Sequence, residues 1–218
     1  MTAVFKRNFI KETFLTFPLF LLTHPFKGFD EMKFGKRGSM TFALTVTFLS
    51  TLVAIFQQGN TGFVFTGFHI EASTVNVLWT TVFTILPILL ICIGNWSVTS
   101  ITGGSGKFKE IFMVYSYALY PGLFLRVAAT IFSNYITVNE LAFVTFLLVF
   151  AQILLYFFLF VGLLVIHEFT LLKGIVMVFL TLLAIMIISF VLALFFALFD
   201  ELWTFVATLI FEIEPHLN

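Results

Sequence analysis

The sequence has few charged residues. Only 10% of its 218 residues are Asp, Glu, Lys or Arg, whereas 61% are hydrophobic. Roughly a quarter of the residues of an ordinary water-soluble domain are charged, so this chain has too little charge to cover a soluble fold. Its formal net charge is zero, which gives no electrostatic reason to bind a nucleic acid. These scarcities favour an integral membrane protein whose first partner is the lipid bilayer.

Cysteine is nearly missing as well. The single residue, Cys92, lies in an apolar run, which excludes an intrachain disulfide and any Cys-x-x-Cys metal or redox pair. A metal site needs three or four converging ligands, and the few histidines are scattered along the chain. We therefore predict no metal and no cofactor. The four histidines are His24, His69, His167 and His216.

What is present is a series of long apolar runs. About 20 largely apolar residues are needed to cross a hydrocarbon layer of ~30 Å, and five runs are long enough. Short connections with turn-forming residues separate them, which indicates antiparallel neighbours. The sequence therefore predicts an all-α polytopic membrane protein, a bundle of five transmembrane helices. The expected spans are Met40–Gln58, Val75–Val98, Ile111–Phe132, Leu141–Val165 and Gly174–Phe199.

Residues 1–39 contain two shorter elements instead of a span. The apolar run Phe14–Leu22 is about half a span long, and Pro18 interrupts it. A second element begins at Pro25, and its large apolar side chains share one helical face. This pattern is typical of an amphipathic helix that lies in the membrane interface. The side chains on that face are Phe26, Phe29 and Met32.

The C-terminal end has the same problem of length. If the fifth span continued to Ile213, the helix would be nearly twice as long as the hydrocarbon layer is thick. Asp200 and Glu201 are therefore expected to end the span, and Leu202–Ile213 to form a separate interfacial helix on the outer side. The predicted division is an N-terminal segment 1–39, a membrane domain 40–199 and an outer helix and tail 200–218.

Lys and Arg residues are distributed asymmetrically. With five spans and a cytoplasmic N-terminus, ten of the eleven lie in segments 1–39, 99–110 and 166–173. These segments share one side of the membrane, and the segments on the other side contain none. Because Lys and Arg in short connections stay on the cytoplasmic side, we predict a multi-pass plasma-membrane protein with a cytoplasmic N-terminus and an extracellular C-terminus.

The connection between the second and third expected spans contains a glycine-rich motif. Gly103-Gly104-Ser105-Gly106-Lys107 lacks the first glycine and the final Ser/Thr of a phosphate-binding P-loop. It also resembles the Gly-x-Ser-Gly motif of rhomboid intramembrane proteases, and His167 is expected on the same side. A serine nucleophile needs a base within hydrogen-bonding reach, and Ser105 lies in a polar connection. A structural glycine turn is the favoured interpretation, and an intramembrane serine hydrolase is the enzymatic alternative.

A few polar or helix-bending residues lie inside the expected spans. Arg126 is the one ionisable residue well within a span, and such residues by default indicate function, a partner or a water-filled cavity. Arg126 can also extend toward the outer headgroups or pair with Glu140. Pro121 is expected to kink the third helix. The candidate intramembrane polar and kink positions are Asn95, Tyr117, Pro121 and Arg126.

Three local patterns resemble the Yip1 family. They are an entry element 24–32, the hairpin with its Gly-Gly-x-Gly-x-Phe-x-Glu motif at 103–110, and the segment 166–173 after the fourth span. The resemblance covers about residues 24–198 and implies five spans, a cytoplasmic N-terminus and no catalytic residues. Eukaryotic members are implicated in vesicle trafficking, interact with Rab-type GTPases and carry a long polar N-terminal region. This chain looks more like the bacterial branch, which implies the bacterial cytoplasmic membrane.

These observations predict a non-enzymatic scaffold or accessory protein that acts through helix packing and a basic cytoplasmic face. A small-molecule transporter, a channel or a component of a larger permease is the alternative, so a small-molecule substrate remains compatible with the sequence. The expected protein partner is another membrane protein or a second copy. We expect Glu168 to pair with Lys107 or Lys109. The candidate interaction surface comprises Gly103, Gly104, Gly106, Lys107, Lys109, Glu110, His167, Glu168 and Lys173.

Overall fold

The computed structural model describes residues 11–62, 64 and 75–213, and in this part of the chain every regular element is a helix. Five of the described helices are long and apolar enough to cross a membrane. The predicted all-α polytopic fold with five spans is therefore confirmed. The five are α4 (Met40–Asn60), α5 (Val77–Thr102), α6 (Phe108–Ser133), α7 (Leu141–His167) and α8 (Leu171–Ile213).

Local sequence explains where these helices begin and end. The Ser39 side chain accepts a hydrogen bond from the Phe42 N–H at 3.4 Å and begins α4, and Asn76 caps α5 through the N–H of Trp79 at 3.0 Å. Gly103 ends α5 in the left-handed conformation, with φ of 75°, as glycine commonly does at a helix C-terminus.

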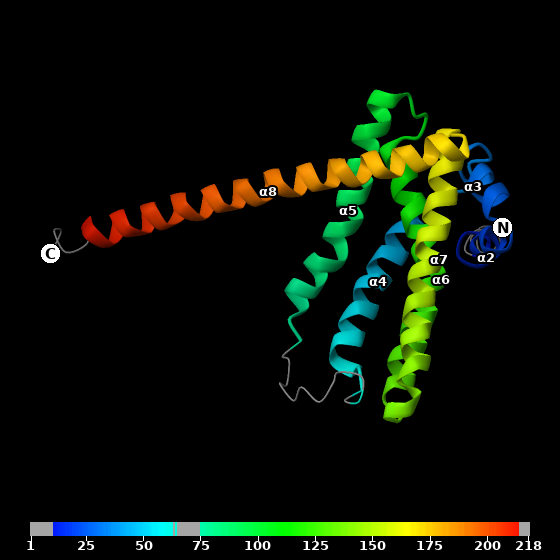
Figure 1. Ribbon diagram of the computed structural model, residues 1–218, viewed down its shortest axis with the longest axis horizontal. Coiled ribbons are helices and arrows are strands. Elements are labelled where there is room, and N and C mark those ends of the chain that lie inside the picture. Colours follow the sequence, from blue (N-terminus) through cyan, green and yellow to red (C-terminus); the bar gives the residue numbers. More distant parts are fainter. Residues whose placement is uncertain (1–10, 63, 65–74, 214–218) are drawn as a thin grey trace, which may run out of the picture.

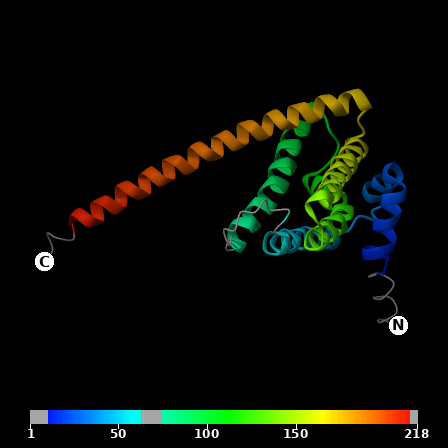
Figure 2. The ribbon, with the colours of Figure 1, turned by 60° about the horizontal axis from the view of Figure 1, so that its bottom comes forward.

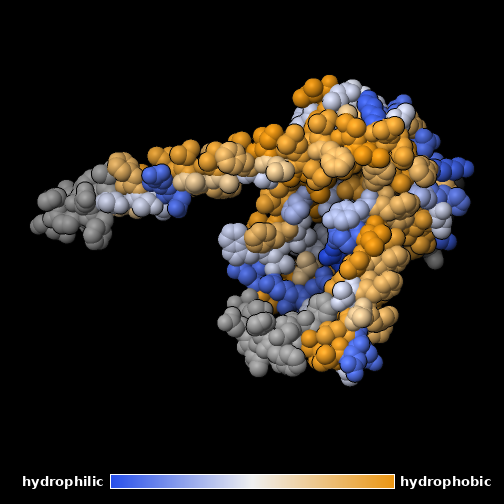
Figure 3. Space-filling view, viewed as in Figure 1, coloured by the Kyte–Doolittle hydropathy of each residue, from blue (hydrophilic) through white to orange (hydrophobic). Residues whose placement is uncertain are grey.

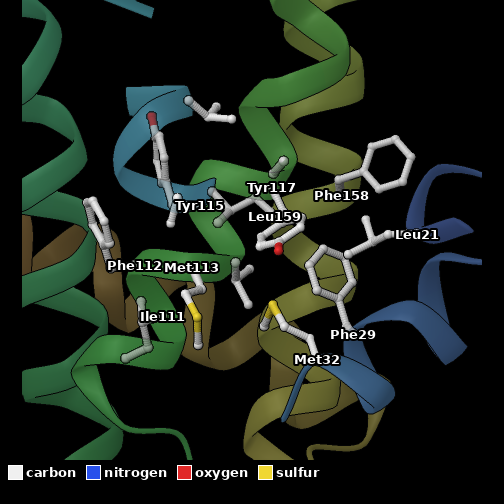
Figure 4. Close-up of a cluster of buried hydrophobic side chains, with 14 of the residues drawn as sticks. Leu21, Phe29, Met32, Ile111, Phe112, Met113, Tyr115, Tyr117, Phe158 and Leu159 are labelled. Atoms are coloured by element: carbon white, nitrogen blue, oxygen red, sulfur yellow. The ribbon is translucent and has the colours of Figure 1, made fainter. Parts of the chain in front are cut away.

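The central helix of the bundle is α6. It packs against α4, α5 and α7, which run beside it in Figure 1, and every residue from Ile111 to Ala118 is buried. Figure 4 shows side chains of this part of α6 meeting residues of α7 and of the N-terminal segment in one cluster. The core therefore lies around the first half of α6. We call the end of the bundle that carries the α5–α6 connection the hairpin end.

The N-terminal segment packs onto the bundle near the hairpin end as η1 (Glu12–Thr16), α2 (Phe17–Thr23) and α3 (Pro25–Lys33). Pro18 follows directly on the π-helical turn η1 within one continuous helical stretch, so it does not end the helix. Phe29 and Met32 of α3 are buried in the protein core, and only Phe26 of that face is exposed. The expectation that this apolar face lies against lipid is therefore corrected for two of its three residues.

Helix α8 differs most from the expectation. It continues through Asp200 and Glu201 without a break, so the predicted separate helix from Leu202 is wrong within the described residues; the end of the predicted tail, 214–218, lies outside them. At 1.5 Å per residue its 43 residues measure roughly 65 Å. No residue from Leu182 to Thr208 is buried, and Figures 1 and 2 both show α8 projecting beyond the other helices. Only its first part packs against the bundle.

Candidate functional site

Lys33, the last residue of α3, connects three segments that are far apart in the sequence. Its Nζ atom donates to Ser105 Oγ at 2.7 Å, to the Ile166 carbonyl at 2.6 Å and to Glu168 Oε1 at 3.1 Å. The Lys33 side chain is only 10% exposed. An ammonium group has three donors and no acceptor, so all of its hydrogen-bonding capacity is used here. Lys33 therefore fastens α3 to the α5–α6 hairpin and to the end of α7.

Glu168 and Ser105 complete this cluster. Glu168 directly follows α7 in the left-handed conformation, with φ of 57°, which is uncommon for a residue other than glycine. Ser105 Oγ lies 3.0 Å from both the Ile166 carbonyl and Glu168 Oε1. Hydrogen bonds from Lys33 first, and then from Ser105, lower the pKa of the Glu168 carboxyl below its ordinary value of 4.5. The ionised carboxylate is thus the form that the cluster stabilises.

This pairing predicts a defined acid sensitivity. Because the folded-state pKa of Glu168 is lowered, its stabilising effect is complete above pH 4.5 and is lost as the pH falls through the lowered value. The thermal unfolding temperature of wild type should therefore fall between about pH 5 and pH 3 more steeply than that of Glu168→Gln. Asp30→Asn, at an exposed position of α3, should keep the wild-type slope. Equal slopes for wild type and Glu168→Gln would contradict the prediction.

His167, the last residue of α7, lies beneath the hairpin and is 3% exposed. The Gly106 N–H donates to its Nδ1 atom at 3.1 Å. Since a backbone N–H can only donate, the ring proton is assigned to Nε2, which lies 3.1 Å from Asn95 Oδ1. Asn95 in turn donates to Thr181 Oγ1 of α8 at 3.2 Å. One chain of hydrogen bonds therefore links the hairpin, α5, α7 and α8.

The glycines of the hairpin make room for His167. A Cβ atom on Gly104 would lie 2.6 Å from His167 Nδ1 and 2.7 Å from Thr99 Cβ. A Cβ atom on Gly106 would lie 2.7 Å from His167 Cε1. All three distances are well below ordinary van der Waals contact. The hairpin approaches the imidazole this closely because these two positions have no side chain.

A family model described as the Yip1 domain matches residues 19–193, a range that contains α3, the hairpin and the turn after α7. The chain belongs to the Yip1 domain family. No curated protein and no solved structure matches it. The predicted family is confirmed, and the assignment to the bacterial branch stays a prediction.

The Yip1 domain thus places three of its segments together at one end of the bundle, as the sequence predicted. Contacts among Lys33, Ser105, Gly106, His167 and Glu168 confirm this juxtaposition. The predicted partner of Glu168 was wrong, because Lys33 occupies the position expected for Lys107 or Lys109. Glu110 accepts from the Lys107 N–H at 2.9 Å and begins α6. Whether these residues form an interaction surface stays a prediction.

Five exposed lysines lie on or next to the segments that this cluster joins. None of these five lysines forms an ion pair with a described residue. Lys173 Nζ lies 4.2 Å from the centre of the Phe169 ring, a cation–π geometry, and Gly103 of the hairpin is also exposed. Figure 3 shows hydrophilic residues gathered at the hairpin end, whereas the sides of the bundle are largely apolar. The exposed cations are Lys27, Lys36, Lys107, Lys109 and Lys173.

The same geometry gives Ser105 no strong base. His167 directs its two ring nitrogens to Gly106 and Asn95, not to Ser105. Lys33 donates all three of its protons and offers no lone pair. Glu168 accepts from Ser105, but a carboxylate with a lowered pKa is a weak base. The described contacts support the structural interpretation of the glycine turn over the serine-hydrolase alternative.

The intramembrane candidates occupy separate places. Asn95 belongs to the His167 chain of hydrogen bonds, and Pro121 lies inside the continuous helix α6. The Tyr117 hydroxyl accepts from the Ser39 N–H at 3.2 Å, and its ring centre lies 4.4 Å from that of Phe42. Tyr117 therefore joins the core to the beginning of α4.

Arg126 does not pair with Glu140 as the sequence suggested. Its Nη2 atom donates to Gln152 Oε1 of α7 at 3.0 Å. The Glu140 carboxylate instead accepts from the Thr137 N–H at 2.9 Å. A carboxylate three residues after a helix N-cap commonly turns back to that cap, so Glu140 is occupied locally.

Sequence reasoning missed two contacts: Lys33 as the partner of Glu168, and Thr181 as a member of the His167 chain of hydrogen bonds. Lys33 stands four residues after Phe29 and therefore on the same face of α3 as a buried residue. A cation on the apolar face of an amphipathic helix indicates a partner inside the protein, and this signal was available. Thr181 carried no comparable signal, because threonines recur throughout the apolar spans.

Proposed function

We propose that this Yip1 domain protein is a non-enzymatic membrane scaffold or accessory protein that presents its hairpin end to a partner. The observation that carries the proposal is the fastening of three distant segments by Lys33. The Yip1 family is not a known enzyme family, and multi-pass membrane embedding agrees with the five long apolar helices. A pre-organised face binds a partner without first having to order its own parts.

The chemistry of this face favours an anionic surface. Five exposed lysines lie on or next to the segments that the Lys33 cluster joins, and each cation near an anionic leaflet contributes ~1 kcal/mol of binding. Exposed apolar side chains lie among them, including Phe34, Phe108 and Leu172. This combination suits a partner at the membrane surface that offers acidic residues close to apolar ones. Lipid headgroups would then complete the contact around its rim.

Site-specific photocrosslinking tests the proposal. A photoreactive amino acid at Lys109 should capture a membrane-protein partner or a second copy in cells. The same group at Tyr135, which is 83% exposed after the end of α6, should not. With the photoreactive amino acid at Phe108 instead, replacing Lys107, Lys109 and Lys173 together by glutamine should reduce capture. A protein that remains monomeric and gives no crosslinked product from position 108 or 109 would contradict the scaffold function.

The orientation remains a prediction from charge and has its own test. Lys107→Cys should be protected from an impermeant thiol reagent added outside intact cells, whereas Tyr135→Cys should react. Both residues are exposed, so burial does not account for a difference, and the native Cys92 is buried. Permeabilised cells should label at both positions. Reaction at Lys107→Cys with protection at Tyr135→Cys would show that the orientation is inverted.

Transport is the second candidate function, and one observation favours it. A cavity of about 300 Å³ lies beside Arg126 within the helices. Toward the hairpin end, however, α6 is buried continuously from Ile111 to Ala118. A pathway across the bundle would require this core to open, so the cavity fits a binding site better than a conduit.

A further inference from the structure

The cavity beside Arg126 is lined by α4, α5, α6 and α7, and it is separate from the hairpin end. Its volume is about 300 Å³, at the lower end of the range of small-molecule sites. Polar and apolar residues both line it. Figure 3 shows the face below α8 hollowed between α5 and α7, with hydrophilic residues inside the hollow.

Arg126 brings a positive charge to this cavity from within a membrane-spanning helix. Of its five N–H donors, the one hydrogen bond formed with a described residue goes to Gln152 Oε1 at 3.0 Å. No carboxylate in residues 11–62, 64 and 75–213 forms an ion pair with it. A charge at such a position is costly unless something neutralises it. Gln152 orients the guanidinium but does not neutralise it.

A second donor at the cavity is the hydroxyl of Tyr115. The residue is only 6% exposed and lines the cavity, yet no described residue forms a hydrogen bond with its hydroxyl. Figure 4 shows this hydroxyl pointing away from the buried cluster around Met113. Every fully buried polar side-chain atom of the described residues has a hydrogen-bond partner, so the unpartnered Tyr115 hydroxyl is reached from the cavity. Tyr115 and Arg126 thus line one cavity with hydrogen-bond donors that no described residue occupies.

We propose that this cavity is a binding site for an oxyanion group, a carboxylate or a phosphate. The planar guanidinium of Arg126 matches both groups through two parallel N–H donors, and the Tyr115 hydroxyl supplies a third. None of the described residues that line the cavity is acidic, so none of them repels an anion. The surrounding apolar residues accommodate the carbon-bearing part of the ligand. The group is carried by a small soluble anion or by the headgroup of an anionic lipid.

The soluble arm of the test uses purified protein in a neutral detergent. Inorganic phosphate and butyrate are titrated against chloride at constant ionic strength, and the thermal unfolding temperature is followed. At a hundredfold excess over Kd the shift should be roughly 5 °C or more. Arg126→Gln should abolish the shift. Tyr115→Phe removes the hydroxyl and keeps the ring, and it should weaken binding by about tenfold or more.

The lipid arm uses nanodiscs of phosphatidylcholine with and without phosphatidic acid and the same variants. A shift with phosphatidic acid alone assigns the site to a lipid headgroup, and a shift in the soluble arm assigns it to a free anion. Lys11→Gln removes an exposed cation that does not line the cavity, so it should leave the shift in both arms unchanged. The proposal is overturned if wild type shows no shift in both arms. It is also overturned if Arg126→Gln and Tyr115→Phe both keep the full shift, or if Lys11→Gln loses it.

Discussion

Replacing Lys33 by methionine should separate α3 from the hairpin and lower the free energy of unfolding by roughly 2–3 kcal/mol. Methionine keeps most of the apolar stem and removes the ammonium, so the effect reports the three hydrogen bonds together with the cation–π contact to Phe34. The Ile166 carbonyl loses its charged donor in a part-buried place, which carries most of the expected cost. Glu168 is 60% exposed and is rehydrated, so it contributes less. Thermal unfolding in detergent measures the loss.

Lys27→Met is the matched control for this prediction. Lys27 lies on the same helix, carries the same charge and is exposed, so its replacement should change stability by no more than about 0.5 kcal/mol. Lys33→Met should also reduce photocrosslinking from position 109, because the hairpin is no longer held against α3. If Lys33→Met is as stable as Lys27→Met, the cluster does not fasten the three segments.

The spans were predictable because a single physical property determines them. Each must cover the hydrocarbon layer with apolar residues, and local caps such as Ser39 and Gly103 mark their ends. Because successive spans cross the membrane in opposite directions, every second connection is expected on the same side. This is why the hairpin and the turn after α7 were expected to meet before any contact was known.

The end of α8 was mispredicted for an equally physical reason. The expectation rested on bilayer thickness, which limits how much of a helix can be in hydrocarbon but does not break the helix. No glycine or proline occurs between Ile175 and Ile213, and Asp200 and Glu201 are compatible with helical hydrogen bonding. The nearest residues that disfavour a helix are Gly174, near the beginning of α8, and Pro215, beyond its described end.

Side-chain partners were less predictable than topology. Sequence placed Lys107, Lys109 and Lys33 on one side of the membrane, but the choice among them depends on how α3 is rotated against α7. That rotation is set by Phe29, whose ring packs closely against Gly162 of α7. A Cβ atom on Gly162 would lie only 3.0 Å from the Phe29 ring. The partner of Arg126 depended likewise on a neighbouring helix, since Gln152 is neutral and gave no charge signal.

Gly106→Ala should destabilise the protein by roughly 1–3 kcal/mol, because its Cβ would meet the His167 ring at 2.7 Å. The ring has little freedom to move, since Asn95 holds Nε2 at 3.1 Å and Phe169 stacks on one face with ring centres 5.2 Å apart. The shift would also lengthen the hydrogen bond from the Gly106 N–H. Gly122→Ala is the matched control. A Cβ atom at this position of α6 would meet nothing closer than 3.4 Å, so the substitution should stabilise the protein by about 0.5–1 kcal/mol.

A double substitution distinguishes this steric origin from a general weakening of the hairpin. In a His167→Ala background the imidazole is gone, so adding Gly106→Ala should cost little beyond the first change. The two substitutions should therefore be non-additive, with a coupling free energy of about 1–3 kcal/mol. His167→Ala alone should itself be destabilising, because Asn95 loses the Nε2–H donor in a buried place. Strictly additive unfolding free energies would mean that Gly106 is required for its backbone conformation and not for its closeness to His167.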